Sequence, residues 1–313
     1  MRALIVTNMY PSADQPALGS FVRDQVDALR RIDGVDVEVF SFEPGAVSAY
    51  VRAAYELRDR HRGYRYDIVH AHYGLTAWPA FAARGKGRAV TLHGTDLAHP
   101  RSRTITLAAL PFLDLVAAVS EPLAAEIPRW AVRGRRAVLP TGVDLDRFRP
   151  IPRPEARAAL GLDQGPYLLF PSDPSRPEKR YDRARAVAGN VRLLSLEAVD
   201  RAKVPLYVNA ANAVLVPSER EGFGLAVLEA LACDVPVLAT PVGIHPSALD
   251  GIAGTYCAPF DERTWRKALA PHLADHDPRV DGRTRADGFS TDRMAANVVA
   301  AWRALLQPSL LQP

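Results

Sequence analysis

The chain has 313 residues, of which 48% are hydrophobic and 24% charged, and its formal net charge is +4 at pH 7. Its two cysteines, Cys233 and Cys257, exclude a disulfide framework and favour a reducing compartment. No stretch reaches the roughly 18 apolar residues that a membrane-spanning helix needs, and the first residues lack the long apolar core of a signal peptide. We therefore expect a cytoplasmic, globular protein with room for two domains of about 150 residues each.

The first part of the chain alternates strand-length apolar runs with helices, which is the pattern of a doubly wound α/β domain. An amphipathic helix is expected at 21–32, with Ser20 as its cap, and a helix of small residues at 76–83. Each strand ends in His, Gly, Thr, Ser or Asp, as a ligand crevice at the carboxyl edge of a parallel sheet requires. The expected strands are residues 2–7, 35–42, 66–74, 88–93, 113–120 and 136–144.

A proline-rich stretch, residues 147–162, interrupts this alternation and is interpreted as an interdomain linker. We therefore expect one domain over 1–150 and a second over 151–290. The second alternation has expected strands at 166–172, 191–196, 213–216, 235–240 and 255–261, and expected helices at 180–188, 204–212, 225–232, up to about 276, and 291–306.

The most informative stretch runs from Pro217 to Thr240, where a short apolar strand leads into an acidic loop and then a helix. Gly222 and Gly224 in this loop allow backbone N–H groups to approach a ligand closely, and a helix N-terminus favours an electronegative group. Glu221 and Glu229 add two carboxylates, which accept hydrogen bonds strongly from hydroxyls. The stretch therefore suits a polyhydroxyl ligand. We expect Glu229, enclosed by apolar neighbours in the sequence, to need a partner.

The sequence E-G-F-G-L-A-V-L-E, followed by A-L-A-C-D-V-P-V-L-A-T and Pro-Val-Gly at 241–243, resembles the E-x(7)-E signature of the retaining, nucleotide-sugar-dependent glycosyltransferases of family four. This resemblance implies the GT-B fold, an α/β architecture of two Rossmann-like, doubly wound domains that face a central cleft. The resemblance implies that the domain 1–150 binds the acceptor and that the domain 151–290 binds the nucleotide sugar. It also implies that the last helix, about 291–313, packs back on the first domain.

The loop at 170–184 brings three cations close together in the sequence, Arg176, Lys179 and Arg180, and fixed cations stabilise a diphosphate as its glycosidic bond breaks. In the family an Arg and a Lys of this loop hold the donor diphosphate. Lys179 matches the family Lys, whereas the usual Gly-Arg is Ser172-Asp173 here, so Arg176 is the proposed substitute.

The resemblance also assigns roles to the central stretch, with Glu221 on the donor sugar and Glu229 on the ribose. Backbone amides of the glycine loop would bind the sugar hydroxyls; its residues are Gly222, Phe223, Gly224 and Leu225. The base site would lie near 196–198. The chain is short between Ala188 and Val204, and the Gly-rich loop VGxGP is absent, so the base is not identified.

In the first domain, Gly19 matches the family's glycine loop, which approaches the donor phosphates across the cleft. His93, followed by Gly94 and Asp96, matches the position near the transferred sugar and the acceptor. Ser120 and the turn 141–144 also stand at strand ends. The catalytic residues that we expect are Glu221, His93, Arg176 and Lys179.

A metal site is the alternative interpretation of His70, His72 and His93. We disfavour it because we expect the rings of His70 and His72 to point to opposite faces of their strand, and no acidic cluster adjoins them. We expect no cofactor. Aromatic residues interleaved with basic ones, as in RNA-binding proteins, are missing, so nucleic acid is not an expected partner.

The expected function is metal-independent transfer of a sugar from a nucleoside diphosphate to a hydroxyl of a cell-surface glycan, a glycolipid or a metabolite. A sugar-nucleotide epimerase or phosphorylase of the same fold, and a sugar-nucleotide-binding protein without turnover, remain alternatives. The Arg-rich stretch 127–138 indicates either a contact with the inner membrane face, serving a lipid-linked acceptor, or a solvated basic surface.

Overall fold

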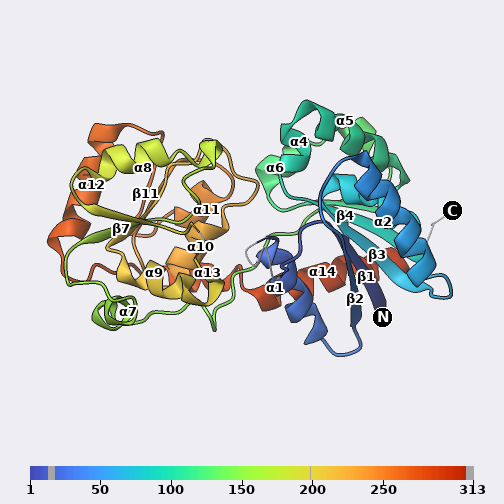
Figure 1. The fold of residues 1–313 in the computed structure, drawn as a ribbon, viewed down its shortest axis with the longest axis horizontal. Helices are drawn as coiled ribbons and strands as arrows, with labels where there is room; N and C mark the ends of the chain where they lie inside the picture. The colour runs from blue at the N-terminus through green and yellow to red at the C-terminus, as the bar shows by residue number, and fades with distance from the viewer. Residues whose placement is uncertain (13–17, 198, 308–313) are drawn as a thin grey trace. The chain divides into compact units, whose positions relative to one another are not determined.

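A computed structural model describes residues 1–12, 18–197 and 199–307. It divides into two compact units, one of Met1–Gly142 together with the last helix, α14 (Thr291–Leu306), and one of Val143–Ser290. Each unit is built on one parallel sheet (Figure 1). The predicted fold class, two doubly wound α/β domains, is confirmed.

The first unit contains a six-stranded parallel sheet in the order β2-β1-β3-β4-β5-β6. The order reverses between β1 and β3, and ligands of such sheets bind beyond the carboxyl ends of the strands at this reversal. The strands are β1 (Arg2–Thr7), β2 (Asp36–Ser41), β3 (Tyr66–His72), β4 (Gly85–Leu92), β5 (Leu115–Ala118) and β6 (Arg135–Val138).

The helices of the first unit connect these strands. Helices α2, α4, α5 and α6 were not predicted, and the predicted 76–83 helix is reduced to a single α-turn. The elements are α1 (Ser20–Arg30), α2 (Val47–Arg60), η1 (Gly74–Thr76), α3 (Ala77–Ala80), α4 (Thr95–Ala98), α5 (Pro100–Ala109), η2 (Leu110–Phe112), α6 (Glu121–Ala125) and η3 (Arg129–Ala131).

Helices α1 and α14 pack side by side in the core of the first unit, although almost the whole chain separates them (Figure 1). Both helices are strongly amphipathic, so each buries one apolar face. Val26 and Leu29 of α1 share one apolar cluster with Val298 and Trp302 of α14 and with Ile5 of the central strand β1. The last helix is therefore a structural part of the first unit.

The second unit contains a five-stranded parallel sheet in the order β11-β10-β9-β7-β8, which reverses between β7 and β9. Its core includes Phe170, Leu215 and Trp265. The strands are β7 (Tyr167–Phe170), β8 (Arg192–Ser195), β9 (Ala213–Val216), β10 (Val237–Ala239) and β11 (Tyr256–Cys257). The helices are α7 (Arg153–Ala159), η4 (Pro177–Lys179), α8 (Tyr181–Ala188), η5 (Arg201–Lys203), α9 (Val204–Ala210), α10 (Leu225–Ala232), α11 (His245–Leu249), α12 (Glu262–Ala274) and α13 (Arg283–Asp287).

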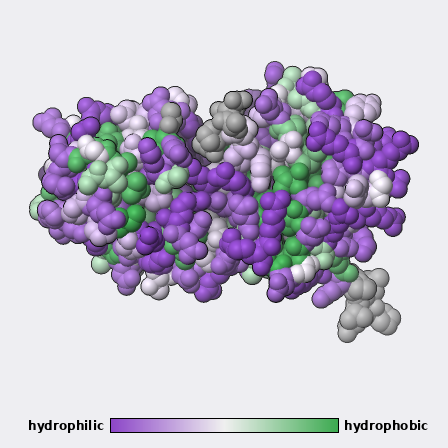
Figure 2. Space-filling view, turned by 60° about the horizontal axis from the view of Figure 1, so that its bottom comes forward, coloured by the Kyte–Doolittle hydropathy of each residue, from purple (hydrophilic) through white to green (hydrophobic). Residues whose placement is uncertain are grey.

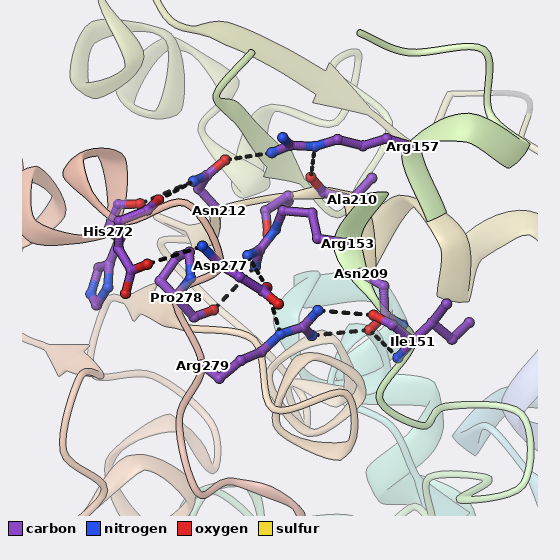
Figure 3. A network of polar contacts seen from close by, with 12 residues as sticks. Ile151, Arg153, Arg157, Asn209, Ala210, Asn212, His272, Asp277, Pro278 and Arg279 are labelled. Carbon is purple, nitrogen blue, oxygen red and sulfur yellow. Dashed lines mark hydrogen bonds and ion pairs between the residues drawn. The ribbon is translucent and has the colours of Figure 1, made fainter. Parts of the chain in front are cut away.

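The stretch predicted as a linker is instead part of the second unit. Helix α7 lies within it, and the side chains of Arg153 and Arg157 are buried, with 0% and 2% exposure. Figure 3 shows that Arg153 pairs with Asp277, which also binds Arg279, while Arg157 donates to the side chain of Asn212. The linker interpretation was wrong because arginines that would be solvated in a linker are here buried and satisfied by carbonyl oxygens and by the partly exposed carboxylate of Asp277.

Much of the surface is hydrophilic (Figure 2). On the face shown in Figure 2, hydrophilic residues cover most of the surface and hydrophobic residues gather in smaller patches. Among the described residues, no helix combines the length and the apolar character needed to cross a bilayer.

Candidate functional site

Lys179 and Glu221 form an ion pair in the second unit. Lys179 Nζ lies 2.7 Å from both carboxylate oxygens of Glu221, and the two side chains are 16% and 10% exposed. The loops that carry them follow β7 and β9, the neighbouring strands between which the sheet order reverses. Two residues that the sequence placed in one site are thus brought together where such sheets bind ligands.

Further hydrogen bonds connect these two loops to each other. The backbone N–H of Glu219 donates to the carbonyl of Glu178 at 2.9 Å, and Arg183 donates to the carbonyl of Pro217 at 3.3 Å. Ser218 Oγ donates to Glu221 Oε1 at 2.8 Å. The carboxylate of Glu221 is therefore fixed by a cation and a hydroxyl before any ligand arrives.

The glycine loop has the backbone freedom that its composition predicts. Gly224 has φ +107°, and a Cβ added to it would lie 2.5 Å from Nε2 of His245. Gly243, on the loop after β10, has φ +57°, and its added Cβ would collide with the carbonyl of Phe223 and lie 3.0 Å from Cβ of Glu221. Glycine is thus required at both positions, because any side chain would push the two loops apart.

Phe223 and Leu225 complete this loop. Phe223 is buried, its ring meets that of Phe289 edge-on, and its carbonyl accepts the N–H of Ile244 at 2.8 Å. Leu225 is half-buried and begins α10, whose N-terminal amides favour an electronegative group. Gly222 is half-buried between Glu221 and Phe223.

His245 was not singled out from the sequence, yet it lies directly against the glycine loop. Its ring is buried, and Nδ1 lies 2.8 Å from the carbonyl oxygen of Thr240. Thr240 in turn donates its hydroxyl to the carbonyl of Ser218, which ties the loop after β10 to the loop of Glu221. The available signal was a histidine just beyond a buried strand, at the carboxyl edge where ligands of parallel sheets bind.

Glu229 lies on the half-exposed face of α10, together with Leu225 and Ala226, whereas Val227, Leu228 and the residues after Glu229 are buried. Glu229 is therefore only partly enclosed, because neighbours in the sequence lie around a helix and not on one side of it. The helix therefore presents this carboxylate one turn beyond the glycine loop.

Arg176 is not brought to Glu221. Its guanidinium is about half exposed and binds Glu178 through Nε and Nη2, at 3.0 and 2.7 Å. Arg180, the third cation of this loop, pairs with Asp182 and Glu219. Lys179 is thus the cation of this loop that meets the predicted sugar-binding carboxylate. The expected base region, 196–198, includes Ala198, which lies outside the described residues.

In the first unit, Gly19 stands at the N-cap of α1 with φ +61°, and an added Cβ would collide with the backbone of Met9. The predicted cap, Ser20, is the first residue of the helix and makes no capping bond. Gly19 is therefore required because its backbone lies against that of Met9, just beyond the end of β1.

The rings of His70, His72 and His93 form a stack, with centroid distances of 4.9 and 5.3 Å. The expectation that the rings of His70 and His72 point to opposite faces was wrong, because residues two apart on a strand share a face. His72 Nδ1 lies 3.1 Å from His93 Nε2, and Gln25 of α1 lies 3.2 Å from His72 Nε2. Burial lowers the pKa of His72 to about 4 and those of His70 and His93 well below their usual value.

Asp96 holds the loop that follows β4. Its buried carboxylate accepts the backbone N–H groups of Gly74, His93 and Gly94, and burial raises its pKa to about 6 despite these bonds. Ser120 is the N-cap of α6, where it accepts from the N–H of Leu123. Within the described residues, no group of three or more His, Cys, Asp or Glu side chains is arranged to hold a metal ion.

Two family models match the chain. One is described as Glycosyltransferase Family 4 and matches residues 18–147, and the other is described as Glycosyl transferases group 1 and matches residues 168–275. The D-inositol 3-phosphate glycosyltransferase of Actinosynnema mirum is 30% identical, with 83% of this chain and 77% of that protein covered. The protein of the same name from Mycolicibacterium paratuberculosis is 28% identical, with 97% and 81% covered.

Solved structures share the fold. A sucrose-phosphate synthase from Thermosynechococcus elongatus superposes with a TM-score of 0.77 at 22% identity, covering 97% of this chain and 98% of that one. The HepE protein of Anabaena, solved with UDP and glucose, superposes with a TM-score of 0.70 at 15% identity, covering 97% and 100%.

Proposed function

The chain belongs to glycosyltransferase family 4 and is a glycosyltransferase of the GT-B fold, and from this premise we propose that it uses a nucleoside-diphosphate sugar and retains the anomeric configuration. The observation that carries the proposal is the Lys179–Glu221 pair beside the glycine loop. A fixed cation, a fixed carboxylate and the amides at the start of α10 together suit a sugar linked to a diphosphate.

In this proposal Lys179 stabilises the diphosphate as the glycosidic bond breaks, and Glu221 holds the hydroxyls of the donor sugar. Glu229 binds the ribose, which its half-exposed place on α10 permits. Arg176 adds a second cation once it leaves Glu178, with which it pairs in the free protein. In the first unit, Gly19 and His93 serve the donor phosphates and the reacting sugar.

The reaction that we propose needs no side-chain nucleophile and no metal ion. The leaving phosphate accepts the proton of the attacking hydroxyl on the same face of the sugar, so that the C–O bond to the acceptor forms as the bond to the phosphate breaks. Lys179 supplies positive charge where the phosphate becomes more negative. Activity unchanged by excess EDTA supports this, and activity lost to EDTA and restored by Mg²⁺ contradicts it.

The acceptor in this proposal is a hydroxyl compound. The similar proteins are named for inositol phosphate, and one of the similar folds for sucrose phosphate, so polyol and sugar phosphates belong in the acceptor screen beside glycolipids and glycans. HepE, solved with UDP and with UDP-glucose, makes UDP-glucose the first donor to assay.

The test is release of nucleoside diphosphate from a panel of UDP-, GDP- and ADP-sugars, with and without acceptor. Release that depends on acceptor, with the anomeric configuration of the product retained by NMR, supports the proposal. An epimer, or a sugar phosphate formed with inorganic phosphate, indicates the epimerase or phosphorylase. Tight binding of a donor without release under every acceptor indicates the binding protein.

A contact with the inner face of the membrane is part of this proposal for a lipid-linked acceptor. The stretch 127–138 presents Trp130, which is 76% exposed, between the exposed side chains of Arg129 and Arg133. A tryptophan flanked by cations suits the boundary between water and an anionic lipid surface. The free thiols of Cys233 and Cys257 are consistent with the cytoplasmic side.

A further inference from the structure

One ring nitrogen of His245 has a hydrogen-bond partner, and the other has none among the described residues. Nδ1 lies 2.8 Å from the carbonyl oxygen of Thr240, which only accepts hydrogen bonds, so Nδ1 carries the proton of the neutral ring. Nε2 is then a bare acceptor. It is buried and has no hydrogen-bond partner among the described residues. Such an unpaired group is costly in a protein interior, which implies a second state of this ring.

Two charged groups act on this ring, and they act in opposite directions. Burial lowers the pKa of His245 below its usual value, the carboxylate of Glu221 raises it, and the ammonium of Lys179 lowers it. Geometry explains the coupling, because Nε2 lies against Gly224 and Gly243 lies against Cβ of Glu221. The histidine thus lies against the loop that carries Glu221, and Glu221 in turn binds Lys179 at 2.7 Å.

We propose that His245 takes up a proton when Lys179 leaves Glu221 for a bound diphosphate. In the free protein Lys179 neutralises Glu221, and the adjacent buried ring is neutral. A diphosphate at Lys179 competes for its ammonium and leaves the carboxylate of Glu221 without its cation. The imidazolium then replaces the lost positive charge, and Glu221 keeps its place beside the glycine loop.

This inference rests on the proposed function, since it needs a diphosphate at Lys179. In it His245 is a positioning residue, because it touches the glycine loop and acts through Glu221. It predicts that binding of the diphosphate consumes a proton from solvent and is stronger at lower pH within the range where His245 titrates.

The first experiment needs no ligand. The titration of His245 is followed by NMR of the imidazole nitrogens in the full chain, in wild type, Lys179→Gln and Glu221→Gln. Lys179→Gln removes a like charge and frees the carboxylate, so the pKa of His245 is expected to rise by about one unit or more, and Glu221→Gln to lower it. Lys203→Gln removes the same charge from η5 and serves as the matched control.

The outcome that overturns the inference is a Lys179→Gln titration of His245 that coincides with those of wild type and Lys203→Gln. If Lys179→Gln perturbs the fold, the titration of His245 in Glu221→Gln alone tests the inference. His272, half-buried in the same unit, is the internal standard, because its titration is expected to be the same in all four proteins.

The second experiment measures protons taken up on binding of UDP and of inorganic pyrophosphate, by calorimetry in two buffers of different ionisation enthalpy. Wild type is expected to take up more protons than His245→Asn. Protons that the phosphate groups of the ligand gain or lose on binding contribute equally in both proteins. Equal proton uptake by the two proteins refutes the protonation of His245 on ligand binding. Failure of both probes to bind refutes the diphosphate site of the proposed function, whereas the NMR titration still decides whether His245 is coupled to the ion pair.

Discussion

Trp302 of the last helix donates its indole N–H to Nδ1 of His70 at 3.0 Å, inside the core of the first unit. Since an indole N–H only donates, Nδ1 of His70 must accept, and the proton of the neutral ring sits on Nε2, 2.8 Å from the hydroxyl of Thr91. A single hydrogen bond from α14 thus fixes the tautomer and the neutral state of the first ring of the histidine stack.

Replacing Trp302 by Phe removes this donor and leaves Nδ1 of His70 buried without a partner. We expect the free energy of unfolding to fall by about 1–3 kcal/mol from the lost bond, and by more from the smaller ring. Urea denaturation measures this. Trp130→Phe is the control at an exposed site, and equal stability of the two variants would contradict the role of Trp302.

The histidine stack makes stability depend on pH. The folded chain keeps His72 neutral down to a pKa of about 4, against about 6.5 when unfolded, so the unfolded chain binds the extra proton between these values. Its stabilisation, about 3 kcal/mol above pH 6.5, is lost as the pH falls through this window. Asp96 acts oppositely, because its raised pKa of about 6 favours the folded state as the pH falls.

Because the pKa values of three histidines are lowered and that of one aspartate is raised, we expect a net loss of stability between pH 6.5 and 4.5, measured by urea denaturation at several pH values. His72→Gln should flatten this dependence. His276→Gln, at an exposed position, should not, and a wild-type stability that stays constant across the window would contradict the prediction.

Asp277 is the carboxylate that pairs with Arg153 and Arg279 in the second unit. Asp277→Ala removes the carboxylate that binds Arg153 and Arg279, and leaves the buried guanidinium of Arg153 with carbonyl partners alone. We expect a loss of about 1–3 kcal/mol, less than for a fully buried pair because Asp277 is 41% exposed. Thermal and urea unfolding test this against Asp182→Ala, which breaks an exposed pair and should cost less than about 0.5 kcal/mol.

Lys179 and Arg176, the two cations proposed to hold the diphosphate, should differ in importance. Lys179→Met is expected to lower kcat by about a hundredfold or more, since it removes a cation fixed beside Glu221. Arg176→Met is expected to cost less, because its exposed guanidinium must first leave Glu178. Steady-state kinetics with the best donor compare both with Arg185→Met on α8, and a larger effect at Arg176 than at Lys179 would reverse the assignment.

Membrane contact through Trp130 is testable by flotation with vesicles that contain anionic lipid. Trp130→Ala should reduce the bound fraction several-fold at low salt, because the indole is the apolar group of this basic surface. Tyr55→Ala removes a comparably exposed aromatic ring from α2 and should leave binding unchanged. Absence of wild-type binding to such vesicles would end the membrane part of the proposal.

The sequence predicted the two parallel sheets and placed Lys179 and Glu221 in one site, because apolar strand runs and polar strand ends are local patterns; their ion pair emerged only from the structure. It failed where the partner of a residue is distant in the chain. Arg153 and Arg157 were interpreted as linker residues because most of their acceptors come from residues more than fifty positions later. His245 was missed for the same reason, since its importance lies in Gly224 and Glu221, which belong to another strand end.

The position of α14 also bears on how the chain is synthesised. The first unit lacks part of its apolar core until α14 has left the ribosome, because Val298, Val299 and Trp302 belong to that core. The second unit is continuous in sequence and precedes α14, so it can complete itself earlier. A nascent chain therefore carries an unfinished first unit until α14 emerges, and the packing of α14 on that unit is the step that completes it.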